Sequence, residues 1–309
     1  MHVSRIRRAA VQAAIFCSVI SLAASAQQDP QPSPTNQSPV AERAAEPRVP
    51  GGSAVGDLLV APTRLIFEGR TRSAEVTLVN IGNETATYRI SFINLRMTDD
   101  GGLKEYADAK PEDMPAAPLI RYSPRQVTLE PHIAQTVRLQ VRKPADLATG
   151  EYRSHLLFRA VPKTEDVAPE ASDEKPKGLQ IRLIPVYGVS IPVIVREGDL
   201  SVNSSITDLS VEQGATAGEP QHLKVKINRS GNESVYGNLR VVLEKNGRNT
   251  TVGVLNGVAV YTPNPFRWIT IPLRAPENVT LDGGRLRVEY SEQAEAGGGT
   301  IAKAELQVP

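Results

Sequence analysis

The stretch Thr136-Val137-Arg138-Leu139-Gln140-Val141 alternates polar and apolar side chains at every position. Successive side chains of a β-strand point to opposite faces of a sheet, so this period of two predicts a strand with one buried face. Glu130-Pro131 precedes the stretch and marks a turn. The same pattern recurs along most of the chain, and it decides the fold class.

Similar runs of β-branched and aliphatic residues fill the first half of the chain after residue 56. Gly, Pro, Asn or Asp residues separate them, and no stretch carries a convincing helical period. The runs lie at residues 58–60, 64–67, 74–80, 87–92, 126–129, 136–141 and 152–159. About seven short strands in about 140 residues are typical of an immunoglobulin-like β-sandwich. We expect this N-terminal domain to span residues 57–196.

The strand pattern starts again after Glu197-Gly198-Asp199. Strand-like runs lie at residues 222–228, 239–244, 258–261, 267–271, 286–290 and 302–308. Lys245-Asn246-Gly247-Arg248 has the residues of a type I′ hairpin turn. We expect a second sandwich over residues 197–309, which makes the chain an all-β protein with two immunoglobulin-like β-sandwich domains.

The longest run, residues 179–196, differs between its two halves. The first half alternates apolar and polar residues, whereas the second half is almost continuously apolar and includes Pro192. Pro185 also lies within the run. Because proline has no amide hydrogen to donate to a ladder, we expect part of this strand to lie at an edge or a bulge.

Residues 1–26 have the pattern of a secretory signal peptide. A basic start with Arg5, Arg7 and Arg8 precedes an apolar run, and Ala24-Ser25-Ala26 fits the cleavage site. Polar residues interrupt the run, and a membrane anchor needs roughly 20 apolar residues. We therefore expect export to the periplasm and no membrane span in the mature chain. Residues 27–56, rich in Pro, Gln, Ser, Ala and Gly, predict a disordered leader.

The single cysteine and the charge balance exclude several classes of function. Cys17 lies within the predicted signal peptide, so the mature chain can form no disulfide, thiol nucleophile or cysteine metal site. The chain has 35 basic and 34 acidic residues, and without the three signal-peptide arginines 32 basic residues face 34 acidic ones, a net charge near −2. This balance does not favour nucleic acid as a partner.

The sequence carries no catalytic motif that we can identify. His132, His155 and His222 lack the spacing of zinc ligands, so we expect them to be solvated or satisfied by hydrogen bonds. Asp99-Asp100-Gly101-Gly102 resembles part of a calcium loop but lacks the later acidic ligands, which favours a hairpin turn. The sequence therefore predicts a protein that is not an enzyme and holds no metal and no cofactor.

Four segments, in order along the chain, resemble the PapD-like family of periplasmic pilus-assembly chaperones. The first two are Ala61-Pro62-Thr63-Arg64-Leu65-Ile66-Phe67-Glu68-Gly69 and Tyr122-Ser123-Pro124-Arg125-Gln126-Val127-Thr128-Leu129. Gly150-Glu151-Tyr152-Arg153-Ser154-His155-Leu156-Leu157-Phe158 and the run from Leu179 follow. The resemblance covers about residues 58–196, and the interior of residues 151–162 departs from the family signature. The chain therefore resembles a divergent, non-classical branch.

In that family, two immunoglobulin-like domains pack in an L shape, and the last strand of the first domain is lent to an incomplete pilin subunit. The resemblance implies a chaperone that caps pilus or fimbrial subunits and delivers them to an outer-membrane usher. Leu179, Ile181 and Leu183 would be the donor residues, since the period of two places them on one face. The alternative is that they only complete the core of their own domain.

The resemblance also implies a basic pair that holds the C-terminal carboxylate of the subunit. Arg64 matches the first member of the pair, although an arginine in an edge strand can also be merely solvated. The second member would fall at Gly188 or Ser190, depending on the alignment, and neither is basic. Arg182 or Arg196 could supply the missing charge.

Two other interpretations stay open. The two sandwiches could serve adhesion at the cell surface or form part of a secretion complex. Because an exposed apolar strand favours pairing with another strand, an empty chaperone could also form a self-capping homodimer.

Overall fold

The structure is a computed structural model that describes residues 53–55, 57–162, 185–214, 216 and 219–309. The predicted signal peptide, most of the predicted leader and the predicted donor-strand residues Leu179, Ile181 and Leu183 lie outside the described residues, as does Arg182. Within the described part of the chain, no helix has the length and apolar character needed to cross a membrane.

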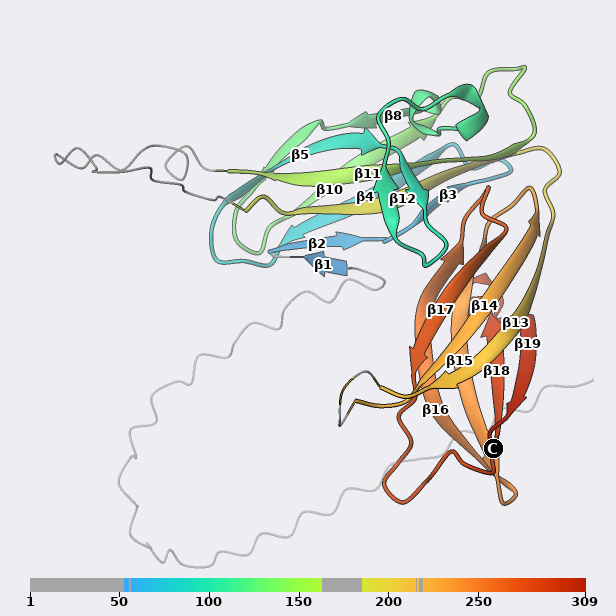
Figure 1. Cartoon of the computed structure of the whole chain (residues 1–309). Helices are drawn as coiled ribbons and strands as arrows, with labels where there is room; N and C mark the ends of the chain where they lie inside the picture. Colours follow the sequence, from blue (N-terminus) through green and yellow to red (C-terminus); the bar gives the residue numbers. More distant parts are fainter. Residues whose placement is uncertain (1–52, 56, 163–184, 215, 217–218) are drawn as a thin grey trace, which may run out of the picture. The chain divides into compact units, whose positions relative to one another are not determined.

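Two five-stranded sheets form the first sandwich (Figure 1). In spatial order, the first sheet contains β1 (Ser53–Val55), β2 (Leu58–Ala61), β4 (Ser73–Asn80), β10 (Ala134–Val141) and β8 (Ile120–Ser123). The second contains β3 (Leu65–Phe67), β12 (Gly188–Glu197), β11 (Gly150–Val161), β5 (Ala86–Ile93) and β9 (Gln126–Leu129). A hairpin of β6 (Leu95–Met97) and β7 (Leu103–Glu105) and the short 3₁₀ turns Pro111–Asp113 and Ala117–Leu119 connect strands of these sheets.

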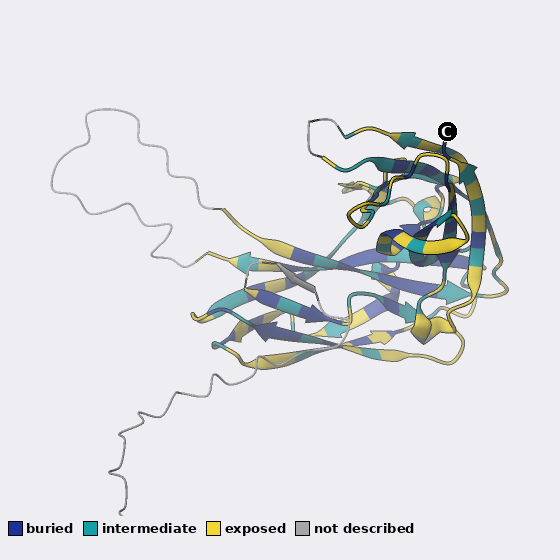
Figure 2. Cartoon of the chain, turned by 90° about the horizontal axis from the view of Figure 1, so that it is seen from below, coloured by how far each residue is buried: buried dark blue, intermediate teal, exposed yellow. Residues whose placement is uncertain are grey.

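Burial alternates along the strands as the sequence predicts. In β10, Val137, Leu139 and Val141 are buried, whereas Arg138 and Gln140 between them are exposed. Figure 2 shows this alternation as buried and exposed bands along the strands. The inward side chains of both sheets join one hydrophobic core. The apolar period of two therefore places the core of the first sandwich correctly.

The second sandwich pairs a three-stranded with a four-stranded sheet. The first contains β13 (Val202–Glu212), β14 (His222–Gly231) and β17 (Phe266–Pro272). The other contains β16 (Arg248–Val260), β15 (Val235–Lys245), β18 (Arg285–Ser291) and β19 (Thr300–Gln307), with the 3₁₀ turn Ala294–Ala296 before β19. Asn246 and Gly247 join β15 to β16 with φ of 52° and 70°, as a type I′ turn requires. The predicted all-β fold with two sandwiches is confirmed.

Strand β12 has a complete partner on only one side. It pairs with β11 along its whole length, but β3 pairs with it only at Val193–Val195. The Ala160 amide donates to the Tyr187 carbonyl at 2.9 Å. Because hydrogen-bonded and non-hydrogen-bonded pairs alternate in an antiparallel ladder, the backbone polar groups of Gly188 and Ser190 point away from β11. We call the side of Gly188–Pro192 that faces away from β11 the free edge of β12, since no described strand pairs with it.

The structure differs from the sequence prediction at two strand ends. Ser53–Val55 form β1, antiparallel to β2, although their composition predicts a disordered leader. A three-residue strand is too short for a period of two to be recognised. The described part of the long run begins at Pro185, but strand β12 begins only at Gly188. The prediction that part of this run lies at an edge is confirmed.

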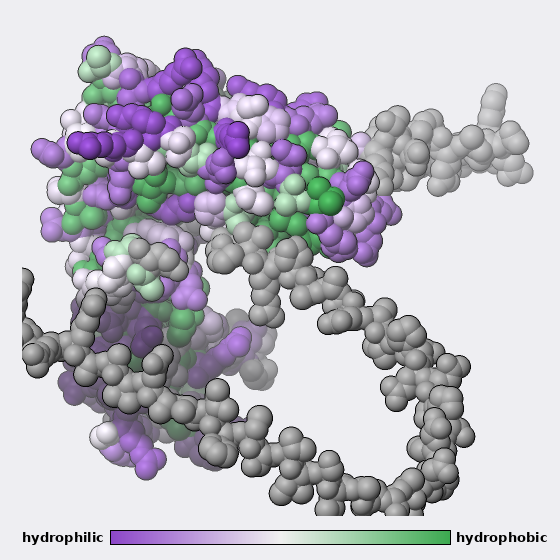
Figure 3. All heavy atoms as spheres, turned by 180° about the vertical axis from the view of Figure 1, so that it is seen from behind, coloured by the Kyte–Doolittle hydropathy of each residue, from purple (hydrophilic) through white to green (hydrophobic). Residues whose placement is uncertain are grey.

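Few large hydrophobic side chains are strongly exposed in the described residues. They are Leu103, Ile133, Val161, Val186, Tyr187 and Val254. On the face drawn in Figure 3, hydrophobic and hydrophilic residues interleave. Val186 and Tyr187 are exposed by 39% and 59% and stand next to each other directly before β12. Apolar surface is therefore available at the start of the free edge.

Leu156 is fully buried in the first core. We expect Leu156→Ala to lower the free energy of unfolding by about 2–5 kcal/mol, because it removes buried methyl groups and leaves a cavity. Val254→Ala, at a position that is 52% exposed, should change it by less than about 0.5 kcal/mol. Urea unfolding of the three proteins measures both values, and equal effects of the two substitutions would contradict the assigned core.

Candidate functional site

Arg64 is held between two tyrosines of the second sandwich. Its guanidinium carbon lies 4.4 Å from the ring centre of Tyr236 and 5.4 Å from that of Tyr261. Its Nη1 donates a hydrogen bond of 3.1 Å to the Tyr261 hydroxyl. The negative face of an aromatic ring attracts a cation at such distances. Tyr236 is the second residue of β15, and Tyr261 directly follows β16, so residues far from Arg64 in the sequence fix its position.

The same guanidinium has unused hydrogen-bond donors. Nε and Nη2 of Arg64 are buried and have no hydrogen-bond partner among the described residues. Stacking on a ring compensates charge but gives no acceptor in the guanidinium plane, so these N–H groups carry a desolvation cost. A carboxylate is the acceptor that matches two guanidinium donors best. Because both donors are buried, an anion can reach them only when the Arg64 side chain moves away from its present contacts. With such a movement, Arg64 is a candidate anion-binding residue.

Two further polar side chains from β11 surround Tyr261. The Arg153 guanidinium carbon lies 4.2 Å from the Tyr261 ring centre, and its Nη1 and Nη2 donate to the carbonyls of Leu95 and Thr262 at 3.2 and 3.4 Å. His155 meets the same ring edge-on, with 6.4 Å between ring centres. Burial lowers the pKa of Arg153. Burial, helped by the charges of Arg153 and Arg64, lowers the pKa of His155 to about 3.

His155 departs from the sequence expectation. The side chain is only 1% exposed, so it is not solvated. Neither ring nitrogen has a hydrogen-bond partner among the described residues, so no described residue satisfies the imidazole by a hydrogen bond. The reason is its position on β11, where it points toward Tyr261 and two cationic side chains. The alternation of residues along one strand cannot show which side chains of the other sandwich will contact its outward face.

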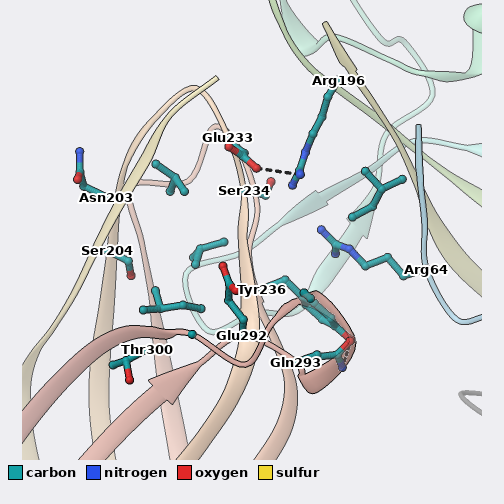
Figure 4. A pocket seen from close by; sticks show the side chains of 16 residues that line it. Arg64, Arg196, Asn203, Ser204, Glu233, Ser234, Tyr236, Glu292, Gln293 and Thr300 are labelled. Carbon is teal, nitrogen blue, oxygen red and sulfur yellow. Dashed lines mark hydrogen bonds and ion pairs between the residues drawn. The ribbon is translucent and has the colours of Figure 1, made fainter. Parts of the chain in front are cut away.

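Arg196 lies in the same region, but its charge is already compensated. Its Nη1 is 3.0 Å from Glu68 and 2.9 Å from Glu233, and its Nε is 3.3 Å from Glu151. The buried Glu151 carboxylate also accepts hydrogen bonds from the backbone amide and the hydroxyl of Ser234. Figure 4 shows Arg196 directed at Glu233 while Arg64 lies beside Tyr236. Arg196 therefore holds strands of the two sandwiches together.

Gly188 and Ser190, the two positions expected for the second residue of the carboxylate-binding pair, both lie on β12. The parallel register pairs Leu65 with Val193, so the residue of β12 level with Arg64 is Pro192. Gly188 and Ser190 lie farther along the free edge. The described part of β12 therefore presents no basic side chain next to Arg64 on this edge.

Arg64 and Arg196 line a common cavity of about 620 Å³. The first sandwich also contributes Ile66. The second sandwich contributes Val202, Asn203, Ser204, Glu233, Ser234, Val235, Tyr236, Glu292, Gln293, Ala296, Gly299, Thr300 and Ile301. Gln293 donates a 3.3 Å hydrogen bond to the Tyr236 hydroxyl. The sequence points to Arg64 and Arg196 but not to Tyr236 and the other residues of the second sandwich, because no local motif marks them.

The predicted hairpin turn at Asp99–Gly102 is confirmed by the pairing of β6 with β7. The Thr98 amide donates to the Gly102 carbonyl at 2.8 Å, and Gly101 has a φ of +87° that favours glycine. The Asp99 carbonyl accepts a 2.7 Å hydrogen bond from the amide of Trp268 in β17. The turn thus contacts the second sandwich. In the part of the chain that the structure describes, no group of three or more His, Cys, Asp or Glu side chains is arranged to hold a metal.

No protein-family model and no curated protein matches the chain. Several solved structures are similar to it. The CupB2 chaperone of Pseudomonas aeruginosa has 16% identity and a TM-score of 0.39, with 80% of this chain and 98% of that chain covered. The SafB chaperone of Salmonella enterica, in complex with SafA pilin, has 15% identity and a TM-score of 0.37, with 83% of this chain and 98% of that chain covered. The chaperone–tip subunit complex of the archaic Csu pili of Acinetobacter baumannii has 12% identity and a TM-score of 0.37. The match covers 82% of this chain and 98% of that chain.

Glu151 is 2% exposed and joins Arg196 to Ser234. We expect Glu151→Gln to lower the free energy of unfolding by about 1.5–3 kcal/mol, because it removes charge-assisted hydrogen bonds at a buried position. Glu75→Gln breaks an exposed pair with Arg138 and should cost less than about 1 kcal/mol. Denaturant unfolding at one pH compares the two, and a Glu151→Gln loss no larger than that of the control would show that the buried network contributes little.

The pKa of His155 is lower in the folded chain than its ordinary value of 6.5. The unfolded state therefore binds the extra proton first, and folding stability is lost as the pH falls from about 6.5 toward about 3. A pH of about 4.5 lies two units below the ordinary pKa of 6.5. This difference corresponds to a loss of about 2–3 kcal/mol in the free energy of unfolding. We expect His155→Leu to lose less stability than the wild type between pH 7 and pH 4.5 by roughly this amount.

The exposed His132 provides the matched control for this pH experiment. It has a φ of 61°, so His132→Asn keeps a residue that tolerates this backbone conformation. We expect His132→Asn to follow the wild-type pH dependence of unfolding. If His155→Leu also follows it, the imidazole is not the group whose protonation opposes folding.

Proposed function

We propose that this chain is a periplasmic chaperone that binds pilus or fimbrial subunits, caps them by donating a β-strand, and delivers them to an outer-membrane usher. The observation that carries the proposal is the free edge of β12, which leads at one end to a guanidinium with unused donors. The fold and the resemblance of residues 58–196 to pilus chaperones support the same function.

The free edge supplies the backbone part of this interaction. The polar groups of Gly188 and Ser190 point away from β11, and an added strand could pair with them. Pro192 lacks an amide hydrogen, which limits hydrogen bonding of an added strand near the point where β12 begins to pair with β3. Strand addition to an open edge is a general mode of recognition, in which the ladder gives affinity and alternate side chains give specificity.

The sequence before β12 supplies the apolar part. Val189 and Ile191 are buried in the first core, and the predicted donor residues Leu179, Ile181 and Leu183 have the same parity along the chain. In an extended segment they would share one face. Each would contribute roughly 1.5–3 kcal/mol if buried in the groove of an incomplete subunit. Val186 and Tyr187, exposed between these two sets, extend the apolar surface.

Arg64 would hold the C-terminal carboxylate of the subunit, which sets where the bound strand ends. Because Arg64 is level with Pro192, a strand that ends there would run along Ser190 and Gly188 toward the donor residues. Arg196 would support the site indirectly, since it is already paired with three carboxylates. Arg182 stays a prediction for a direct contact. The competing interpretation, a surface adhesion or secretion-complex component, gives no role to the unused donors of Arg64.

The test is co-expression with a pilus subunit in the periplasm, followed by purification of the chaperone. We expect Ile181→Asp combined with Leu183→Asp to reduce the amount of bound subunit at least tenfold, because two buried carboxylates replace apolar contacts. Gln180→Asp is the control for the carboxylate itself, since it adds one carboxylate at the opposite parity, where the double variant adds two. It should retain the subunit.

The outcomes separate the proposal from its alternative. A double variant that binds as much subunit as the wild type would rule out donor-strand capping by this segment. An adhesion protein would instead be accessible to protease or antibody on intact cells and would show no dependence on Arg64. A self-capping homodimer predicts that the purified chain without subunit sediments as a dimer and that the double variant sediments as a monomer.

A further inference from the structure

The cavity beside Arg64 has room for much more than a carboxylate. Its volume of about 620 Å³ falls in the range of roughly 300–1,000 Å³ that pockets for whole small molecules occupy. Arg64 and Arg196 line it from the first sandwich, and most of the other lining residues belong to β13, the start of β15, the β18–β19 connection and the start of β19 (Figure 4). A terminal carboxylate at Arg64 would leave most of the cavity to the side chain of the same residue.

Apolar and polar side chains both line the cavity. Ile66 of the first sandwich and Val202, Val235 and Ile301 of the second supply aliphatic surface. Asn203, Ser204 and Thr300 supply polar groups around it. Pockets that combine apolar surface with polar groups bind the apolar part of a ligand and orient it by the polar contacts.

Two acidic side chains also line the cavity and limit what it can accept. Glu233 is paired with Arg196, and burial raises its pKa. Glu292 is exposed and belongs to the connection that precedes β19. A carboxylate side chain in the cavity would approach both groups without a free cation besides Arg64. Like charges at short distance in a partly desolvated site repel.

We infer that the cavity recognises the last residue of the bound subunit and prefers a bulky uncharged side chain, an aromatic one above all. The side chain lies against Ile66, Val202 and Ile301, while the carboxylate of the same residue is bound by Arg64. An aromatic side chain has the largest apolar surface that a single residue can bury there. A terminal alanine leaves the aliphatic wall uncovered. This inference rests on the proposed function and adds the chemistry of the terminal residue to it.

The experiment uses the full chaperone and a co-purified pilus subunit whose last residue is changed to Phe, Ala or Asp. We expect the complex with terminal Phe to dissociate at least about tenfold more slowly than that with Ala, a difference of about 1.4 kcal/mol. The complex with terminal Asp should dissociate faster than both. Asn203→Trp, at an exposed position of β13 that lines the cavity, should remove the difference between Phe and Ala.

Thr270→Trp is the matched control, because Thr270 is exposed on β17 and does not line the cavity. It should keep the preference for terminal Phe. Thr300→Trp obstructs the cavity from β19 and replaces Asn203→Trp if that variant fails to fold. Equal dissociation of the three complexes from the wild type overturns the inference and leaves the proposed function intact. If the wild type holds no subunit, or holds it as well as a chaperone with Ile181→Asp and Leu183→Asp does, the proposed function fails and the inference fails with it.

Discussion

The register of β12 is the constraint on which the rest of the site depends. Pairing with β11 turns Val189, Ile191 and Val193 into the first core. A shift by one residue would expose these side chains and bury Ser190 and Pro192 instead, so hydrophobic burial holds the register firmly. The same register turns the alternate backbone groups outward and aligns the strand with β3, whose preceding residue is Arg64. The free edge and its distance from Arg64 are therefore consequences of the core.

Two arginines near this strand show how environment separates structural from binding roles. Arg196 has three carboxylate partners, so removing it would leave acids without a counter-ion and disturb the contact between the sandwiches. Arg64 is attracted by two aromatic rings but keeps two unused donors. Cation–π attraction positions the guanidinium without consuming its hydrogen-bonding capacity. The unused donors are buried, so an anion from outside can bind them only when the Arg64 side chain moves.

The sequence predicts the strands and turns that depend on local alternation of residues. It does not predict the contacts between side chains that are far apart in the sequence. The inward side chains of β10 follow from a period of two, and the turn at Asn246–Gly247 follows from residues that tolerate positive φ. The contact between Arg64 and Tyr261 joins residues 197 positions apart, and no alternation in either strand specifies it. The buried, unpaired state of His155 has the same origin, since it results from docking against Tyr261. The predicted donor residues lie outside the described residues and stay predictions.

The central claim is that a subunit strand adds to the free edge of β12, and amide hydrogen exchange tests it most directly. In the chain alone, the amides of Gly188 and Ser190 should exchange faster than those of Val189 and Ile191, which point to β11. Binding of a pilus subunit should slow exchange at Gly188 and Ser190 specifically. Unchanged exchange at these two amides in a complex that is fully formed would contradict the account.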